Sequence, residues 1–130
     1  MANILVIEDN TALNEAYEMI LTSEGHHVVV AHDGQEGLDK LVGFTPDLIL
    51  LDLLMPTLDG IGFLKKYRKL HPDDGTKIVI LTNLDQDKEI TTALKLGAYK
   101  YIVKARTSPK QLAINVNHLV SHNIDKKPDK

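Results

Sequence analysis

The chain has 130 residues, of which 43% are hydrophobic and 25% are charged, and its formal net charge is -3. This length and composition fit one globular domain that folds alone, and they argue against wholesale disorder or a fibrous repeat. The absence of cysteine excludes disulfides, thiolate metal sites and thiol nucleophiles. The slightly negative charge offers no basic surface for nucleic acid or an anionic membrane, so we expect protein partners.

The N-terminus leads directly into an apolar run and lacks the basic flank and longer apolar core of a signal peptide. The apolar runs are also far shorter than the roughly 20 residues that a membrane-spanning helix needs. We therefore expect a soluble, cytoplasmic protein.

The first part of the chain is predicted to alternate between strands and helices. A continuous β-branched and aliphatic run predicts a buried strand over residues 4–7, and apolar residues at helical spacing then predict a helix that Gly25 ends. A second strand is expected over residues 27–31 and a short helix over residues 34–42. The third strand is expected over residues 48–51, with a loop after it.

The second part repeats this alternation. Its elements are expected in the order helix, strand, helix, strand and helix, at residues 61–70, 78–81, 85–96, 101–103 and from 109 onward. Gly97 suits the left-handed end of a helix, and Ser108 with Pro109 supplies an N-cap and a first helical residue. Helical periodicity then gives way to charged residues, so we expect a domain over residues 1–122 and a flexible tail over residues 123–130.

Five strands that alternate with five helices predict an α/β fold, in which right-handed crossovers join a parallel sheet that has helices on both faces. The expected architecture is a three-layer, doubly wound (βα)5 domain. In such sheets the functional residues lie outside the carboxyl ends of the strands, where the strand order reverses. Five residues that end apolar runs are expected there: Glu8, Asp9, Asp52, Thr82 and Lys104.

Asp52 is central to this set, because it stands inside an apolar run with no sequence neighbour to neutralise it. Three gathered carboxylates repel one another unless a hard divalent cation binds them, which predicts a site for Mg²⁺ or Mn²⁺ at Glu8, Asp9 and Asp52. A carboxylate can also attack phosphorus and form an aspartyl phosphate. We therefore predict that Asp52 is the nucleophile, and that Thr82 and Lys104 bind the phosphoryl oxygens.

Four motifs, spread over about residues 2–122, resemble those of one known family. They are the acid pair Glu8 and Asp9, Leu51-Asp52 with the following Met-Pro-Thr-Leu-Asp-Gly loop, Leu81-Thr82, and the Tyr-Ile-Val-Lys run that ends at Lys104. The family is the response regulator receiver domain, or CheY-like domain, of two-component systems and phosphorelays. The resemblance implies a flavodoxin-like sheet with strand order 2-1-3-4-5. It also implies that a histidine kinase or phosphotransfer protein donates the phosphoryl group to Asp52.

The resemblance implies further roles. Tyr101 is the ring that turns inward when Thr82 moves to the phosphoryl group, and the backbone carbonyl of Leu54 is a further metal ligand. The fourth helix, fifth strand and fifth helix form the surface that binds a downstream target or a second copy. The domain would be a signalling switch that catalyses only its own phosphotransfer and dephosphorylation, either alone or within a larger regulator, and would not itself bind nucleic acid or membrane.

Three features depart from the family pattern. Ala105 stands where proline is usual, and because a cis peptide without proline costs about 2.5–4 kcal/mol, we predict a trans Lys104–Ala105 bond. Asn83 replaces a small residue, so its amide either reaches the phosphoryl group or narrows access to it. Leu54 and Leu84 flank the approach of hydrolytic water and cannot orient it, so we predict slow dephosphorylation.

The sequence also fits other functions to different degrees. Asn83 and Ala105 also fit a degenerate receiver that is not phosphorylated and serves as a protein-binding scaffold. A flavin-binding protein of this topology is disfavoured, because Glu8 and Asp9 would repel the flavin phosphate. An aspartyl phosphatase usually has a second acid two residues after its nucleophile, where this chain has Leu54.

Some of the polar residues also have plain structural interpretations. Asp9-Asn10-Thr11 fits the cap of a helix. His118 and His122 have i, i+4 spacing but no acidic partner between them, so we expect exposed histidines and not a metal site. His26 and His27 precede a strand and are expected to face solvent.

Overall fold

The structure, a computed structural model, describes residues 1–72, 75–83 and 87–126 of the chain. Its strands are β1 Asn3–Ile7, β2 His27–Ala31, β3 Leu48–Asp52, β4 Lys77–Thr82 and β5 Lys100–Val103. They form one parallel sheet in the order β2-β1-β3-β4-β5. This confirms the predicted fold class and the strand order that the resemblance implied.

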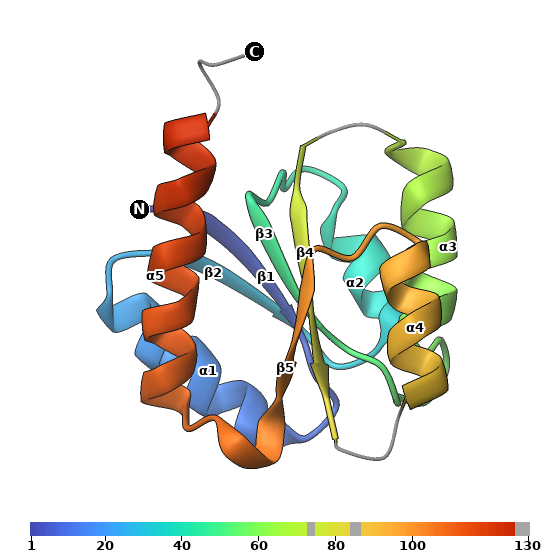
Figure 1. Cartoon of the computed structure of the whole chain (residues 1–130), viewed down its shortest axis with the longest axis horizontal. Helices are drawn as coiled ribbons and strands as arrows, with labels where there is room; N and C mark the ends of the chain where they lie inside the picture. The colour runs from blue at the N-terminus through green and yellow to red at the C-terminus, as the bar shows by residue number, and fades with distance from the viewer. Residues whose placement is uncertain (73–74, 84–86, 127–130) are drawn as a thin grey trace.

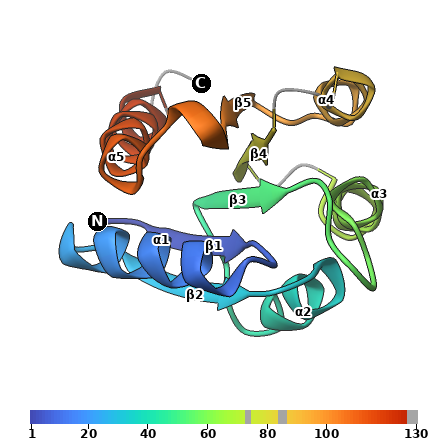
Figure 2. The same cartoon turned by 90° about the horizontal axis from the view of Figure 1, so that it is seen from below.

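Helices cover both faces of the sheet. They are α1 Thr11–Ser23, α2 Gly34–Lys40, α3 Gly60–Leu70, α4 Asp87–Lys95 and α5 Pro109–Lys126, and a 3-10 turn, η1, covers Lys104–Arg106. Helices α1 and α5 pack on one face, and α2, α3 and α4 pack on the other (Figures 1 and 2). The result is the expected three-layer arrangement. Among the described residues, no helix combines the length and apolar composition that crossing a bilayer requires.

The central strands are buried on both faces, which explains why they are continuous apolar runs in the sequence. Val6 and Leu50 point toward the cluster under α1 and α5, whereas Ile7 and Leu51 point toward the cluster under α2, α3 and α4. All four side chains are fully buried. The two cores hold β1 and β3 side by side, and this arrangement fixes the positions of the residues that follow them.

Short polar side chains begin the helices. Asn10 accepts a hydrogen bond from the N–H of Leu13 at the start of α1, and Asp59 accepts one from the N–H of Gly62 at the start of α3. At α5 the Oγ of Ser108 accepts a hydrogen bond from the N–H of Gln111, as its position before proline predicted. These hydrogen bonds satisfy backbone N–H groups in the first turns of α1, α3 and α5.

Two helices differ from their expected ends by two residues or more. Helix α5 continues to Lys126, past the boundary expected at residue 122, because the apolar pattern marks only its buried part and no proline or glycine interrupts the backbone. Helix α2 ends at Lys40 and not at residue 42, since Leu41 is already its C-cap. The expected start of α4 at residue 85 lies outside the described residues.

The histidine predictions are confirmed in part. His27 and His118 are exposed, as expected. The expectation for His26 is wrong, because this side chain is buried: its Nδ1 accepts the N–H of Ala2 at 3.1 Å, and its Nε2 lies 2.6 Å from Oδ1 of Asn117 on α5. The side chain of His122 lies outside the described part of the structure.

Candidate functional site

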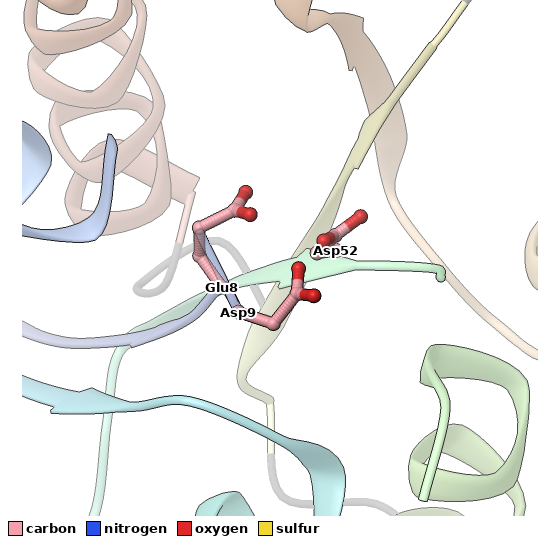
Figure 3. Close-up of side chains that lie close together, drawn as sticks. All are labelled: Glu8, Asp9 and Asp52. Atoms are coloured by element: carbon pink, nitrogen blue, oxygen red, sulfur yellow. The ribbon is translucent and has the colours of Figure 1, made fainter. Parts of the chain in front are cut away.

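The sheet register brings the ends of β1 and β3 together. Ile7 pairs with Leu51, so Glu8, which follows β1, lies beside Asp52, the last residue of β3. One carboxylate oxygen from each of Glu8, Asp9 and Asp52 lies within 4.8 Å of the other two. Figure 3 shows the three side chains converging from the two strand ends. The structure therefore brings together the three acids that the sequence assigned to a cation.

The acid cluster suits a small divalent cation. Its donors are carboxylate oxygens, which Mg²⁺ prefers, and two oxygens about 2.1 Å from one Mg²⁺ lie at most about 4.2 Å apart. A spread of 4.8 Å is close to that limit, so a small adjustment of one side chain allows shared coordination. Glu8 and Asp52 are buried and Asp9 is exposed, which leaves the cluster accessible from solvent on the side of Asp9.

Lys104 supplies the positive charge that Asp52 lacks among its neighbours in the sequence. Its Nζ lies 3.1 Å from Oε1 of Glu8 and 3.4 Å from Oδ1 of Asp52, and its side chain is only 14% exposed. Val103 pairs with Thr82, so the residue after β5 reaches the same edge of the sheet as the acids. The N–H of Leu54 also points to Oδ1 of Asp52, at 3.4 Å.

The electrostatics of the site follow from burial and crowding. Burial raises the pKa of Asp52 to about 7, and the charge of Glu8 adds to this increase against the opposing charge of Lys104. Burial lowers the pKa of Lys104, but the negative charges of Asp52 and Glu8 outweigh this and raise it above its usual value. In Tyr17, burial, with the charges of Glu8 and Asp52, raises the pKa to about 12. A divalent cation in the cluster would favour the ionised form of Asp52.

Thr82 and Tyr101 lie at the neighbouring strands. Asp52 pairs with Leu81, which places Thr82 one residue further along β4; its side chain is fully buried and its Oγ1 donates to the carbonyl of Asn83 at 3.0 Å. The ring of Tyr101, on β5, is 45% exposed and lies at the surface. Thr82 is therefore near the acids at the carboxyl ends of the strands. Tyr101 is a surface residue of β5, the last strand in the sheet order.

The residues that depart from the family pattern are placed as follows. The described residues contain no cis peptide bond, so the Lys104–Ala105 bond is trans, as predicted. Leu54 is 53% exposed and Asn83 is exposed, so both lie at the protein surface. The prediction for Leu84 lies outside the described residues, and the metal role of the Leu54 carbonyl stays a prediction.

The Asp59-Gly60 pair brings the start of α3 close to the backbone of Asp52. Asp59 caps α3, and the N–H of Gly60 donates to the carbonyl of Leu53 at 2.9 Å. A Cβ at position 60 would lie 2.6 Å from the carbonyl oxygen of Asp52 and 2.7 Å from the Cα of Leu53. Only glycine lets α3 begin this close to the backbone of Asp52.

Sequence reasoning missed one buried polar residue beside the site. Asn14 donates from Nδ2 to the carbonyl oxygens of Glu8, at 2.8 Å, and Ala31, at 2.9 Å. A signal was available, because Asn14 is a polar residue at helical spacing from the buried Tyr17 and Leu21.

Comparison with known proteins gives a consistent result. Residues 4–117 match the family described as response regulator receiver domain. Transcriptional regulatory protein AfsQ1 of Streptomyces coelicolor is 38% identical to this chain over 104 residues, which cover 80% of the chain and 45% of AfsQ1. Response regulator ArlR of Staphylococcus aureus is also 38% identical over 104 residues, covering 80% of the chain and 46% of ArlR. The chain thus spans less than half the length of these two relatives.

Solved structures agree with the sequence relatives. A response regulator receiver domain protein (CheY-like) from Methanospirillum hungatei superimposes with a TM-score of 0.86 at 28% identity, covering 97% of this chain and 98% of that one. NtrX from Brucella abortus superimposes with a TM-score of 0.85 at 26% identity, covering 98% of this chain and 28% of NtrX.

Proposed function

The chain belongs to the response regulator receiver domain family, and on that premise we propose that it is a phosphoacceptor switch in which Asp52 receives the phosphoryl group. One observation carries the proposal: the Asp52 carboxylate shares a 4.8 Å cluster with Glu8 and Asp9, and the ammonium of Lys104 lies 3.4 Å from Asp52 and 3.1 Å from Glu8. A phosphoacceptor needs this combination of nucleophile, cation and metal ligands. The donor is a histidine kinase or phosphotransfer protein, and we place the reaction in the cytoplasm.

The proposed transfer is a single displacement at phosphorus. A carboxylate oxygen of Asp52 forms a bond to phosphorus while the phosphorus–nitrogen bond of a phosphohistidine breaks. The electron pair of the broken bond leaves with the imidazole, which takes up a proton. A receiver of this kind is a signalling protein whose chemistry is limited to its own phosphotransfer and dephosphorylation.

Residues of this chain would bind the charge that arrives with the phosphoryl group. Glu8, Asp9 and Asp52, with the Leu54 carbonyl, would hold Mg²⁺ or Mn²⁺, which neutralises phosphoryl oxygens as a Lewis acid. Lys104 is already paired with Asp52 and donates to one phosphoryl oxygen after transfer.

Switching would follow from the same contacts. Thr82 donates its hydroxyl to another phosphoryl oxygen, and the exposed ring of Tyr101 turns into the space that Thr82 leaves. The surface formed by α4, β5 and α5 then changes its affinity for a downstream target protein or for a second copy of the chain.

Mass spectrometry tests the proposed function. Incubation with acetyl phosphate and Mg²⁺ should add about 80 Da, the mass of one phosphoryl group, to the intact chain. The gain should be absent in Asp52→Asn and present in the control Asp47→Asn. Asp47 is an exposed acid that immediately precedes β3, whereas Asp52 ends this strand. An unmodified wild type, tested with phosphohistidine donors as well, would support the rival function, an unphosphorylated protein-binding scaffold.

A further inference from the structure

Asn14 is a buried polar residue to which the proposed phosphotransfer assigns no role. It lies near the start of α1 and is 1% exposed, on the same buried helix face as Tyr17 and Leu21. Its amide donates to two backbone carbonyls outside the helix, at the ends of two strands. A buried amide is stable only when it is hydrogen-bonded, and here its bonds are directed at the turn that carries the paired acids.

The two hydrogen bonds fix the position of the Glu8–Asp9 peptide. The carbonyl of Glu8, which accepts from Asn14 at 2.8 Å, is part of the planar unit that joins the two acids. The carbonyl of Ala31, at the end of β2, accepts both from Asn14 at 2.9 Å and from the N–H of Glu8 at 3.0 Å. The turn after β1 is therefore tied to β2 through Asn14 as well as through its own backbone.

Other contacts hold the side chain of Glu8. Its Oε2 accepts from the N–H of Asn10 at 3.1 Å, and its Oε1 accepts from Lys104 at 3.1 Å. Asp9 is exposed, so the position of its carboxylate depends on the backbone that carries it. A rotation of the Glu8–Asp9 peptide would therefore displace Asp9 from the cluster before it displaced Glu8.

We infer that Asn14 is a positioning residue for the divalent cation, because its amide holds the Glu8–Asp9 peptide in the orientation that brings both acids to Asp52. This inference rests on the proposed function, since it takes the acid cluster to be the cation site. Asn14 does not touch the cation or the phosphoryl group. It acts through the backbone of the acids that do.

Calorimetric titration of the metal-free chain with Mg²⁺ tests the inference directly. The variant Asn14→Leu keeps the branching and the number of side-chain heavy atoms and removes both donors, so the Kd for Mg²⁺ should rise about tenfold or more, the usual effect of losing a group that orients metal ligands. A matched control is Thr76→Val, which removes a buried hydroxyl that donates to the carbonyl of Pro46 at 2.8 Å. This bond lies at the opposite edge of the sheet, so the control should lose stability and keep the Kd of wild type.

The reaction with acetyl phosphate separates positioning from general damage. In Asn14→Leu the Mg²⁺ concentration for half-maximal rate should rise with the Kd, while the rate at saturating Mg²⁺ stays close to that of wild type. A merely structural defect would lower the rate at every Mg²⁺ concentration. Asn14→Ser, which keeps one donor, gives a second measurement if the leucine variant does not fold, and its Kd should lie between those of wild type and Asn14→Leu.

The failures are distinguishable. If wild type binds Mg²⁺ and a folded Asn14 variant binds it equally well, the positioning role of Asn14 is wrong and the proposed function stands. If wild type itself neither binds Mg²⁺ nor accepts a phosphoryl group, the proposed function fails and the inference fails with it.

Discussion

The Nζ of Lys104 lies 3.4 Å from Oδ1 of Asp52, so the residue that follows β5 is paired with the residue that ends β3, two strands away. The same ammonium lies 3.1 Å from Glu8. One cation therefore balances part of a buried negative site, and we expect the stability of the metal-free domain to depend on it.

Replacing Lys104 should destabilise the metal-free domain. In Lys104→Met the buried carboxylates of Glu8 and Asp52 lose their partner, which should cost about 3 kcal/mol in the free energy of unfolding at pH 8. Lys104→Arg keeps the charge and should lose less. Urea unfolding in the presence of EDTA measures both variants, and equal stability of the two would show that the charge of Lys104 is not what matters.

The raised pKa of Asp52 predicts a pH dependence of stability. The folded domain keeps a proton on Asp52 up to about pH 7, whereas the unfolded chain releases it near its ordinary value of 3.8. The folded state binds more protons in this interval, so this contribution to stability is complete below about pH 4 and is lost as the pH rises to about 7.

Asp52→Asn should remove this dependence. Without metal, the variant should be more stable than wild type by about 2–4 kcal/mol at pH 8, and the difference should nearly vanish at pH 4. Mg²⁺ should stabilise wild type at pH 8 and leave Asp52→Asn largely unaffected. If wild type and Asp52→Asn differ in stability by the same amount at pH 4 and pH 8, the pKa of Asp52 is not raised by burial and the charge of Glu8.

Thr82 and Tyr101 should separate phosphorylation from its consequence. The double variant Thr82→Ala, Tyr101→Ala removes the proposed switch hydroxyl and the surface ring but leaves Asp52, Lys104 and the acids in place. It should still gain mass with acetyl phosphate, while backbone amide signals of α4 and β5 shift much less than in wild type. If NMR spectra show the full wild-type shift on phosphorylation, switching takes another route.

Leu54 should determine how long the phosphoryl group persists. Its side chain is 53% exposed beside Asp52 and offers water no hydrogen bond. Leu54→Asn should therefore speed the decay of the aspartyl phosphate several-fold, whereas Leu54→Met should leave it near the wild-type rate. The decay is followed by intact mass after removal of acetyl phosphate, and an unchanged rate in the asparagine variant would contradict the proposed basis of slow dephosphorylation.

The convergence of the site could be predicted because it depends on few local signals. Glu8, Asp52, Thr82 and Lys104 each follow or end an apolar run, and the carboxyl ends of parallel strands share one edge of the sheet. Periodicity and hydrophobic runs therefore predicted that the acids and Lys104 meet, without any knowledge of their side-chain contacts, whereas the roles of these residues and of Thr82 stay predictions. The strand order itself came from the family resemblance, since alternation of strands and helices does not determine it.

The features that could not be predicted depend on distant partners or local strain. His26 can be buried because both of its ring nitrogens are hydrogen-bonded, one to the N–H of Ala2 and the other to Asn117 on α5. No local sequence pattern indicates these contacts. The helical spacing of Asn14 marks it as a buried residue, but nothing in the sequence indicates that its amide binds the carbonyls of Glu8 and Ala31. Thr57 has a positive φ of 67° within the loop after Asp52, a conformation that β-branched residues seldom adopt.

The most direct measurement is to locate the phosphoryl group on the chain. Borohydride reduces an aspartyl phosphate to homoserine, which tandem mass spectrometry can identify in the tryptic peptide that spans residues 41–65. After treatment with acetyl phosphate and Mg²⁺, we expect homoserine at position 52. Unreduced aspartate at position 52 in a chain that carries the phosphoryl group elsewhere, or in a chain that has gained no mass, would contradict the assignment of Asp52.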